Sequence, residues 1–233
     1  FNAPGNTNAS STLGPESDMD DIDDTLDLIS HIKDAEGNFV LKVGRLLEMR
    51  YGINIISDIR DSCDLPIIYD GKIADIPYIS AKIAESAYNA GADAVIVHGC
   101  VGADVVEAVV DLGMGDVIVV VEMSHPGWGR CAHNSWDILE TVNVGAHGVV
   151  LPATNSDVTR EILKVLSPDI YSMTPGVGAQ GAEVGAGFEV GATYEIIGRK
   201  IYEDRNPRWM AVYCYGWAHY YKHVRRMNGR FIY

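Results

Sequence analysis

Cysteine is scarce in this sequence and shows no pairing pattern. Only four cysteines occur in 233 residues, and no two of them have C-x-x-C spacing. Zinc knuckles and dithiol redox sites need such spacing, so neither is predicted. Cys63, Cys100, Cys131 and Cys214 are therefore expected to be thiols in a reducing cytosol.

Positive charge and long hydrophobic runs are also lacking. Lysine and arginine number 18 against 32 aspartates and glutamates, which gives a formal net charge of −14. This balance disfavours general affinity for nucleic acid or acidic membranes, so an anionic ligand must be held by a local site. No apolar run approaches the roughly 18 residues of a membrane span, and the first residues do not resemble a signal peptide. We expect a soluble cytoplasmic protein.

The sequence does contain a regular alternation of apolar runs and helical patterns. Hydrophobic residues make up 47% of the chain, enough for a sizeable core. Strands are predicted at 39–44, 65–70, 94–98, 117–122, 148–151, 169–174 and 194–198. Helices are predicted between them at 45–61, 77–90, 103–113, 135–143 and 156–166. Strict alternation indicates a parallel sheet, and the length suits one α/β barrel or two small domains, of which we favour one.

The region before Asp20 is poorly patterned. Residues 1–17 are rich in Asn, Ser, Thr, Gly and Pro, and they are interpreted as a loose N-terminal arm before a barrel domain at 18–233. Seven strands can be counted from Phe39 onward, so the eighth strand of a barrel has to lie before Asp20. The stretch TLGPESDMDD is too polar for a typical barrel interior.

The segment YDGKIADIPY, residues 69–78, carries the most informative charges. Asp70 and Lys72 end an apolar run, and residues two apart in an extended chain point to the same face. On an inner strand of a parallel barrel both lie at the carboxyl end, where barrel enzymes keep their catalytic groups. Asp75 follows on the loop, three residues after Lys72. The alternative is an ordinary strand end with solvated charges.

Two later strands are followed by loops of unusual composition, and the last strand ends beside an arginine. Residues 122–127 read EMSHPG, and residues 174–181 read TPGVGAQG. Backbone N–H groups of glycine loops can approach an anion closely, although a plain flexible loop has the same composition. Gly198 and Arg199 end the last strand, where barrels often bind phosphate. A surface ion pair is the alternative for Arg199.

Together these segments resemble one known family. D-x-K-x-x-D-I at 70–76, GADAVIVHG at 91–99, EMSHPG at 122–127, PGVGAQG at 175–181 and IIGRKIY at 196–202 are similar in order and spacing to orotidine 5'-phosphate decarboxylase of the archaeal type. The likeness covers about residues 39–204. One such motif alone is weak evidence, whereas five in order on successive strand ends are highly specific.

The resemblance implies a fold and an activity. It implies a TIM (β/α)8 barrel that forms a homodimer with active sites at the interface. The expected reaction converts orotidine 5'-monophosphate to uridine 5'-monophosphate and carbon dioxide, the last step of de novo pyrimidine synthesis. The resemblance implies no cofactor and no metal.

The resemblance also implies roles for individual residues. Lys72 is expected to protonate C6 of the pyrimidine as carbon dioxide leaves, while Asp70 crowds the substrate carboxylate. Lys42 is expected to contact the ribose and to complete an alternating Lys-Asp-Lys-Asp array with Asp75. Asp75 and Ile76 are expected to reach into the active site of the partner subunit.

Phosphate and base binding are implied at three further strand ends. Ser124 is expected to hydrogen-bond the pyrimidine ring, and Gly198 and Arg199 to hold the phosphate. The loop from Pro175 to Gly185 is expected to close over the ligand, with Gln180 bridging phosphate and base. Its expected ligand-binding residues are Pro175, Gly176, Val177, Gly178, Ala179, Gln180 and Gly181.

The sequence departs from the family pattern at several positions. Asp20 aligns with the family's ribose-binding aspartate, although the residues before it are polar. The family usually has threonine two residues after ADIP, where this chain has Ile79 followed by Ser80. His219 and His223 have the spacing of a metal-binding pair on a helix, but HYYKH lacks the glutamate of the zinc-protease motif.

Other functions stay open alongside the decarboxylase. A magnesium-dependent sister barrel, either a 3-keto-L-gulonate 6-phosphate decarboxylase or a hexulose-phosphate synthase, shares D-x-K-x-x-D. A non-catalytic nucleotide-binding barrel fits the polar first strand. A nucleic-acid platform in the aromatic and basic tail, residues 209–233, is disfavoured by the acidity of the chain.

Overall fold

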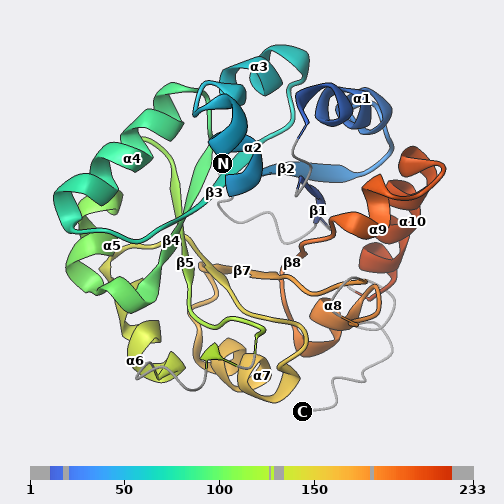
Figure 1. Ribbon diagram of the computed structural model, residues 1–233. Coiled ribbons are helices and arrows are strands. Elements are labelled where there is room, and N and C mark those ends of the chain that lie inside the picture. Colours follow the sequence, from blue (N-terminus) through green and yellow to red (C-terminus); the bar gives the residue numbers. More distant parts are fainter. Residues whose placement is uncertain (1–10, 18–20, 126, 129–133, 179–180, 222–233) are drawn as a thin grey trace.

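Eight parallel strands enclosed by helices make up the computed structural model, which describes residues 11–17, 21–125, 127–128, 134–178 and 181–221 (Figure 1). The strands lie side by side in chain order. They are β1 (Ser11–Ser17), β2 (Asn38–Gly44), β3 (Ile67–Ile73), β4 (Ala94–His98), β5 (Asp116–Val120), β6 (Gly148–Val150), β7 (Tyr171–Thr174) and β8 (Tyr194–Glu195). Since β1 also contacts β8, the sheet curls into a barrel, and the predicted (β/α)8 fold is confirmed.

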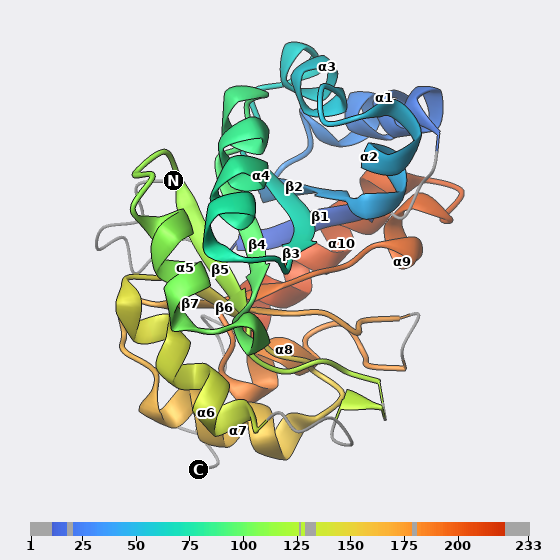
Figure 2. The same ribbon diagram turned by 60° about the vertical axis from the view of Figure 1, so that its left-hand side comes forward.

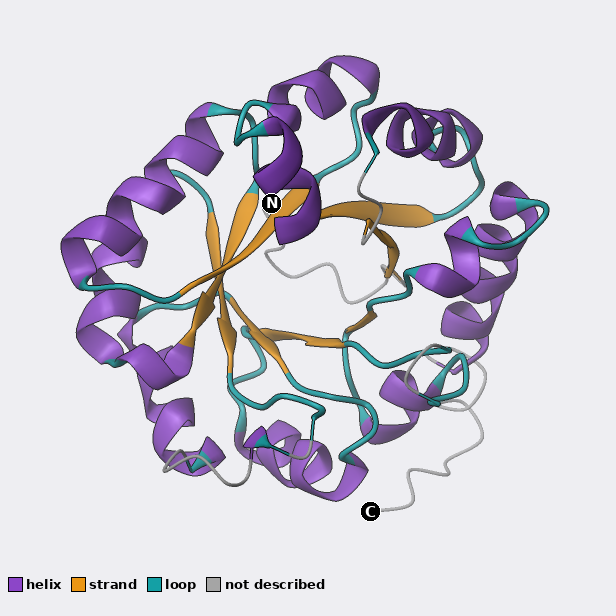
Figure 3. Cartoon of the chain, in the orientation of Figure 1, coloured by secondary structure: helices purple, strands orange, loops and turns teal. Residues whose placement is uncertain are grey.

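Helices form an outer layer around the strands (Figure 3). They are α1 (Ile22–Ile32), α2 (Arg45–Tyr51), α3 (Ile55–Ser62), α4 (Pro77–Asn89), α5 (Ala103–Val110), α6 (Ser135–Glu140), α7 (Ser156–Val165), α8 (Ala186–Val190), α9 (Arg199–Tyr202) and α10 (Pro207–His219). The 3-10 turns η1 (Gly99–Val101) and η3 (Thr141–Val144) lie between β4 and α5 and between α6 and β6. Among the described helices, none is long and apolar enough to span a bilayer.

The buried side chains of the strands form two layers. The inner cluster consists of Val40, Ile68, Ala94, Ile96, Ile118, Val120, Val150, Met173, Tyr194 and Ile196. Alternate strand residues such as Leu41, Val95 and Val119 belong instead to the cluster beneath the helices. Because side chains alternate between the two faces of a strand, residues two positions beyond the inner ones also face inward, at the carboxyl ends of the strands.

The first strand lies within the region predicted to be a loose arm. Residues 11–17 form β1 and pair in parallel with β2, with a register shift between Leu13 and Glu16 around Pro15, which has no N–H to donate. The arm prediction is therefore wrong for residues 11–17. The ladder is made by backbone groups, which pair whatever the polarity of the side chains. The eighth strand does lie before Asp20.

The single helix predicted for residues 45–61 is two helices, α2 and α3. Gly52, just after α2, has φ of 80°, a conformation that favours glycine, and its N–H donates to the carbonyl of Glu48. This break turns the chain, so that α2 contacts β2 while α3 contacts α1 and β3. Figure 2 shows α1, α2 and α3 gathered at one end of the molecule, beside β1 and β2.

Candidate active site

Two lysines and one aspartate meet at the carboxyl ends of the neighbouring strands β2 and β3. Lys42 Nζ and Lys72 Nζ each donate a hydrogen bond of 2.7 Å to Asp70 Oδ2. Lys42 and Asp70 face the barrel interior because they follow Val40 and Ile68 of the inner cluster by two residues. The side chains of Lys42 and Asp70 are 1% and 5% exposed, whereas that of Lys72 is 39% exposed. The structure thus brings together three of the four predicted catalytic residues.

Lys72 owes its position to an irregularity in β3. It is the one described non-glycine residue with a positive φ, which is 42°. The pairing of β3 with β4 shifts register between Tyr69 and Ile73, as expected of a bulge. Such strained backbone conformations cluster at functional sites. The bulge keeps Lys72 and Asp70 in hydrogen-bond contact, where a regular pleat had been predicted.

Asp70 carries a stable negative charge. Burial alone would raise the pKa of this carboxyl, but the ammonium groups of Lys42 and Lys72 outweigh burial and lower the pKa from 3.8 to about 2. Its second oxygen, Oδ1, is buried and has no hydrogen-bond partner in the described part of the chain. A buried polar atom left without a partner requires an explanation, and a ligand group is one.

Asp70 and Lys72 border a cavity of about 100 Å³ at the carboxyl end of the barrel. The other residues that line it are Ile96, Val120, Glu122, Met123, Ser124, Val150, Pro175 and Ile196. An apolar wall with a few polar groups is typical of small-molecule sites. Ser124 and Pro175, both predicted to bind substrate, therefore share one cavity with the lysine cluster.

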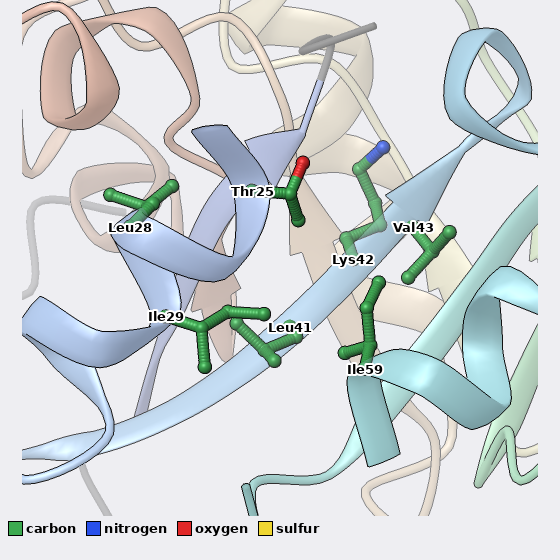
Figure 4. A pocket seen from close by; sticks show the side chains of 7 residues that line it. All are labelled: Thr25, Leu28, Ile29, Leu41, Lys42, Val43 and Ile59. Carbon is green, nitrogen blue, oxygen red and sulfur yellow. The ribbon is translucent and has the colours of Figure 1, made fainter. Parts of the chain in front are cut away.

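Apolar side chains of α1 and α3 pack against the segment of β2 that carries Lys42. A second, small cavity of about 10 Å³ lies among them (Figure 4). It is lined by Thr25, Leu28, Ile29, Leu41, Lys42, Val43 and Ile59. Figure 4 shows the ammonium group of Lys42 extending away from Leu41 and Ile59. The side chain of Lys42 therefore points away from these apolar residues, and its ammonium group meets Asp70.

The two predicted phosphate-binding segments follow β7 and β8. After β7, the N–H of Gly178 donates to the carbonyl of Ala182, and the N–H of Ala182 to that of Gly176, at 2.8 and 3.1 Å. After β8, Gly198 directly precedes α9, whose first residue is the exposed Arg199. The loop residues within the described structure are Pro175, Gly176, Val177, Gly178 and Gly181. Three predicted site residues, Asp20, Ala179 and Gln180, lie outside it.

Asp75 and Ile76 do not line the cavity of their own chain. Both are exposed at the start of α4, Ile76 by 63%. The Oγ of Ser80 is buried, accepts from the N–H of Asp75 at 3.2 Å and donates to the carbonyl of Asp75 at 2.9 Å. Ser80 thus holds the Asp75 backbone in place. The Lys-Asp-Lys-Asp array is incomplete within a single chain.

One known protein family matches most of this chain. The model of the orotidine 5'-phosphate decarboxylase / HUMPS family matches residues 17–211, most of the chain. The chain belongs to this family. It is 41% identical over 193 residues to orotidine 5'-phosphate decarboxylase of Pyrococcus abyssi, covering 82% of this chain and 91% of the relative. The Thermococcus kodakarensis enzyme of that name is 42% identical over 176 residues, which are 75% of this chain and 82% of the relative.

Solved structures of decarboxylases share the fold of this family member. The Pyrococcus horikoshii enzyme superimposes with a TM-score of 0.81 at 34% identity, covering 89% of this chain and 99% of that one. The Methanocaldococcus jannaschii enzyme, solved with the inhibitor BMP, gives a TM-score of 0.80 at 33% identity, covering 90% and 98% of the two chains. The comparisons therefore agree with the resemblance inferred from the motifs.

Glu122 is a cavity residue to which sequence reasoning assigned no role, although it belongs to the EMSHPG motif. It is buried, and its Oε1 accepts from Asn155 Nδ2 at 3.0 Å while its Oε2 accepts from the hydroxyl of Ser135. Burial raises the pKa of Glu122, against the opposing hydrogen bonds from Asn155 and Trp128. Glu122 therefore ties together the segments that follow β5 and β6 beside Ser124. Its position two residues beyond the inner residue Val120 was the available signal.

The aromatic tail begins as an ordinary barrel helix. α10 contacts α1 and β1. Along the helix, the ring of Trp209 stacks on that of Tyr213, which meets the ring of Trp217 edge to face. His219 ends the helix, while His223 lies outside the described residues. Within the described ranges, no group of three or more His, Cys, Asp or Glu residues is arranged to hold a metal.

Proposed function

We propose that this chain decarboxylates orotidine 5'-monophosphate to uridine 5'-monophosphate, with Lys72 as the proton donor to C6. The supporting observation is the Lys42–Asp70–Lys72 cluster, which sets a buried carboxylate and an ammonium group at the edge of a cavity. Membership of the family and the names of the relatives support the same reaction.

Decarboxylation at C6 requires a site that stabilises a carbanion. Loss of carbon dioxide breaks a carbon–carbon bond and leaves the electron pair on C6 of the ring, so charge must be stabilised where it develops. The ammonium group of Lys72, held by Asp70, supplies a positive charge at that edge of the cavity. Lys72 then gives a proton to C6, which forms the new C–H bond, and regains a proton from solvent.

One lysine does not account for the whole rate enhancement. Two unit charges 4 Å apart interact by about 4 kcal/mol at an effective dielectric constant near 20, whereas enzymes lower barriers by roughly 8 to 23 kcal/mol. Binding energy from the distant phosphate can supply desolvation and positioning at the reacting carbon. We assign the phosphate to Gly198, Arg199 and Gln180, the base to Ser124 and the ribose to Lys42. Repulsion between Asp70 and the substrate carboxylate is a secondary contribution.

The exposed position of Asp75 supports a site shared between two subunits. Apolar side chains that follow it in the sequence are exposed as well, namely Ile76, Tyr78 and Ile79, as are Leu46 and Met49 on α2. Exposed apolar side chains gathered into a patch are typical of a protein–protein interface. We therefore propose a homodimer in which Asp75 and Ile76 complete the cavity of the partner subunit.

The ultraviolet absorbance of orotidine 5'-monophosphate, followed with purified protein in excess EDTA, tests this function. A fall in absorbance in proportion to enzyme concentration is the expected result, and it separates the decarboxylase from the magnesium-dependent sister enzymes. Unchanged absorbance with bound uridine 5'-monophosphate would identify a non-catalytic nucleotide-binding barrel instead.

A further inference from the structure

A second carboxylate is buried on the opposite side of the barrel wall from the cavity. Glu195 ends β8 and has no exposed surface. Its neighbours Tyr194 and Ile196 belong to the inner cluster, so the Glu195 side chain faces outward, under the helices. A glutamate in this apolar layer is unusual, because buried carboxylates need hydrogen-bond partners.

The partners of Glu195 are two backbone N–H groups at the start of α8. The N–H of Gly185 lies 3.0 Å from Oε1 and 2.9 Å from Oε2, and the N–H of Gly187 lies 2.7 Å from Oε1. Gly185 has φ of 98°, and a Cβ on Gly187 would collide with Thr174 and lie 3.0 Å from Glu195 Cγ. Both glycines are thus suited to a close approach of this segment to β7 and β8.

Glu195 lies at the junction of the two predicted phosphate-binding segments. Gly185 ends the glycine-rich loop that leaves β7 at Pro175, a cavity residue. In the other direction the chain runs from Glu195 through Ile196, which also lines the cavity, to Gly198. The carboxylate therefore links the end of one segment to the beginning of the other.

We propose that Glu195 is a positioning residue, whose ionised carboxylate fixes the Gly185–Gly187 backbone against β8 and so sets the affinity of the site for the substrate phosphate. Its link to phosphate rests on the proposed function, whereas the anchoring itself does not. Glu195 lies behind the barrel wall and takes no part in the chemistry at C6.

The anchoring depends on pH because the carboxyl of Glu195 titrates near neutral pH. Burial raises the pKa of Glu195 from 4.5 to about 7, opposed by the N–H groups of Gly185 and Gly187 and assisted by the charge of Glu189 on α8. The thiol of Cys214 on α10 interacts electrostatically with Glu195, and also with Lys200 and Asp204.

Protonation of Glu195 weakens the anchor. An ionised carboxylate accepts from both N–H groups with a full negative charge, whereas a protonated one is neutral and one of its two oxygens becomes an O–H donor. Because the folded-state pKa is raised, the contribution of Glu195 to the stability of the fold is greatest when Glu195 is neutral, below about pH 4.5, and is lost as the pH rises through about 7. The anchor and the contribution of Glu195 to stability thus respond to pH in opposite directions.

The substitution Glu195→Gln tests the proposal in the full-length protein. Glutamine keeps the size and one acceptor oxygen, but it carries no negative charge, and its NH2 group replaces the oxygen Oε2 that accepts from Gly185. At pH 8 we expect KM for orotidine 5'-monophosphate to rise about tenfold, with kcat changed by less than about twofold. The ratio of the KM values of variant and wild type should approach one at pH 6, where wild-type Glu195 is protonated. Glu203→Gln, an exposed glutamate just after α9, is the matched control and should leave KM unchanged.

A second measurement needs no substrate. Hydrogen exchange of the Gly185 and Gly187 amides should be faster in Glu195→Gln than in wild type at pH 8, and the two proteins should converge at pH 6 after correction for intrinsic exchange. Equal protection at pH 8, or a KM ratio that does not vary with pH, would overturn the proposal. If wild type fails to turn over the substrate, the proposed function fails, and amide exchange still decides the role of Glu195.

Discussion

At the scale of single residues, the site is governed by one anion shared between two cations. Asp70 Oδ2 accepts from both Lys42 and Lys72, and the side chain of Lys42 is almost completely buried. A buried charge is tolerated only when it is paired, so Asp70 stabilises the buried Lys42 while it also holds Lys72, the proposed proton donor. Lys72, which is partly exposed, is the member of the cluster able to reach a ligand.

Substitution of Lys72 by alanine should abolish turnover. The proton donor and the positive charge beside the cavity are both lost, so we expect kcat to fall by at least about 10³-fold. The fold should persist, because Asp70 keeps its hydrogen bond to Lys42. Initial rates and circular dichroism would show both effects. The control Lys164→Ala removes an exposed lysine of α7 paired with Glu161 and should leave kcat unchanged. A near-normal kcat in Lys72→Ala would exclude this residue as the acid.

Substitution of Asp70 by asparagine should destabilise the protein in a pH-dependent manner. Lys42 then stays buried without a counter-charge, and we expect the free energy of unfolding to fall by about 3 kcal/mol at pH 7. The pKa of Asp70 is lowered to about 2, so its stabilising contribution is present above the unfolded value near 3.8 and is lost as pH falls toward 2. Urea denaturation at several pH values should show the gap between variant and wild type closing in acid. Equal stability at pH 7 would contradict this account of the cluster.

At the scale of elements, the bulge in β3 sets the position of Lys72, the proposed proton donor. Gly71 lies between Asp70 and Lys72, and a Cβ at this position would meet the buried ring of Tyr69, whose hydroxyl oxygen would be 2.7 Å away. Burial raises the pKa of Tyr69 to about 12, with a further contribution from Glu48, so the ring stays neutral. The strand can therefore follow this path only with glycine at position 71.

Gly71→Ala should damage activity more than stability. Displacement of Lys72 by a fraction of an ångström to an ångström should lower kcat roughly 10- to 100-fold, while crowding against Tyr69 lowers the free energy of unfolding by about 1 to 3 kcal/mol. Gly216→Ala on α10 is the control, since a Cβ there meets nothing within 4 Å and should stabilise the helix by about 0.5 to 1 kcal/mol. Kinetics and thermal unfolding measure the two effects. Unchanged kcat in Gly71→Ala would show that the bulge does not control Lys72.

At the scale of the whole molecule, the exposed loop before α4 points to a second subunit. Each proposed site takes Lys72 from one chain and Asp75 from the other. A dimer of one Lys72→Ala chain and one Asp75→Asn chain therefore has one site with both residues intact and one site with neither. Random exchange gives one half hybrids, each with one of two sites intact, and hence about a quarter of wild-type activity. Activity should be measured after mixing the two inactive proteins. If mass spectrometry of tagged subunits shows that the subunits exchange but no activity is regained, the shared site is contradicted.

Much of this architecture was predictable because it depends on local pattern. The alternation of apolar runs and helical periods indicated a barrel, and the charges after apolar runs marked its carboxyl end. The two-residue spacing of Asp70 and Lys72 predicted that they share one face of the strand, and the structure joins them by a hydrogen bond through a bulge. The sequence did not predict a role for Glu122. Its partners Ser135 and Asn155 are 13 and 33 residues away, and no sequence spacing relates them to Glu122.

The sequence by itself determined the succession of strands and helices, the family and the polar residues at the strand ends, because side-chain periodicity and motif spacing are properties of neighbouring residues. Only the tertiary structure decided that polar residues 11–17 form a strand, since their partner is the backbone of β2. It also decided that Glu195 is buried against Gly185 and Gly187. From sequence alone, a glutamate near a strand end is expected to be exposed to solvent, and only the packing of α8 over β8 buries it.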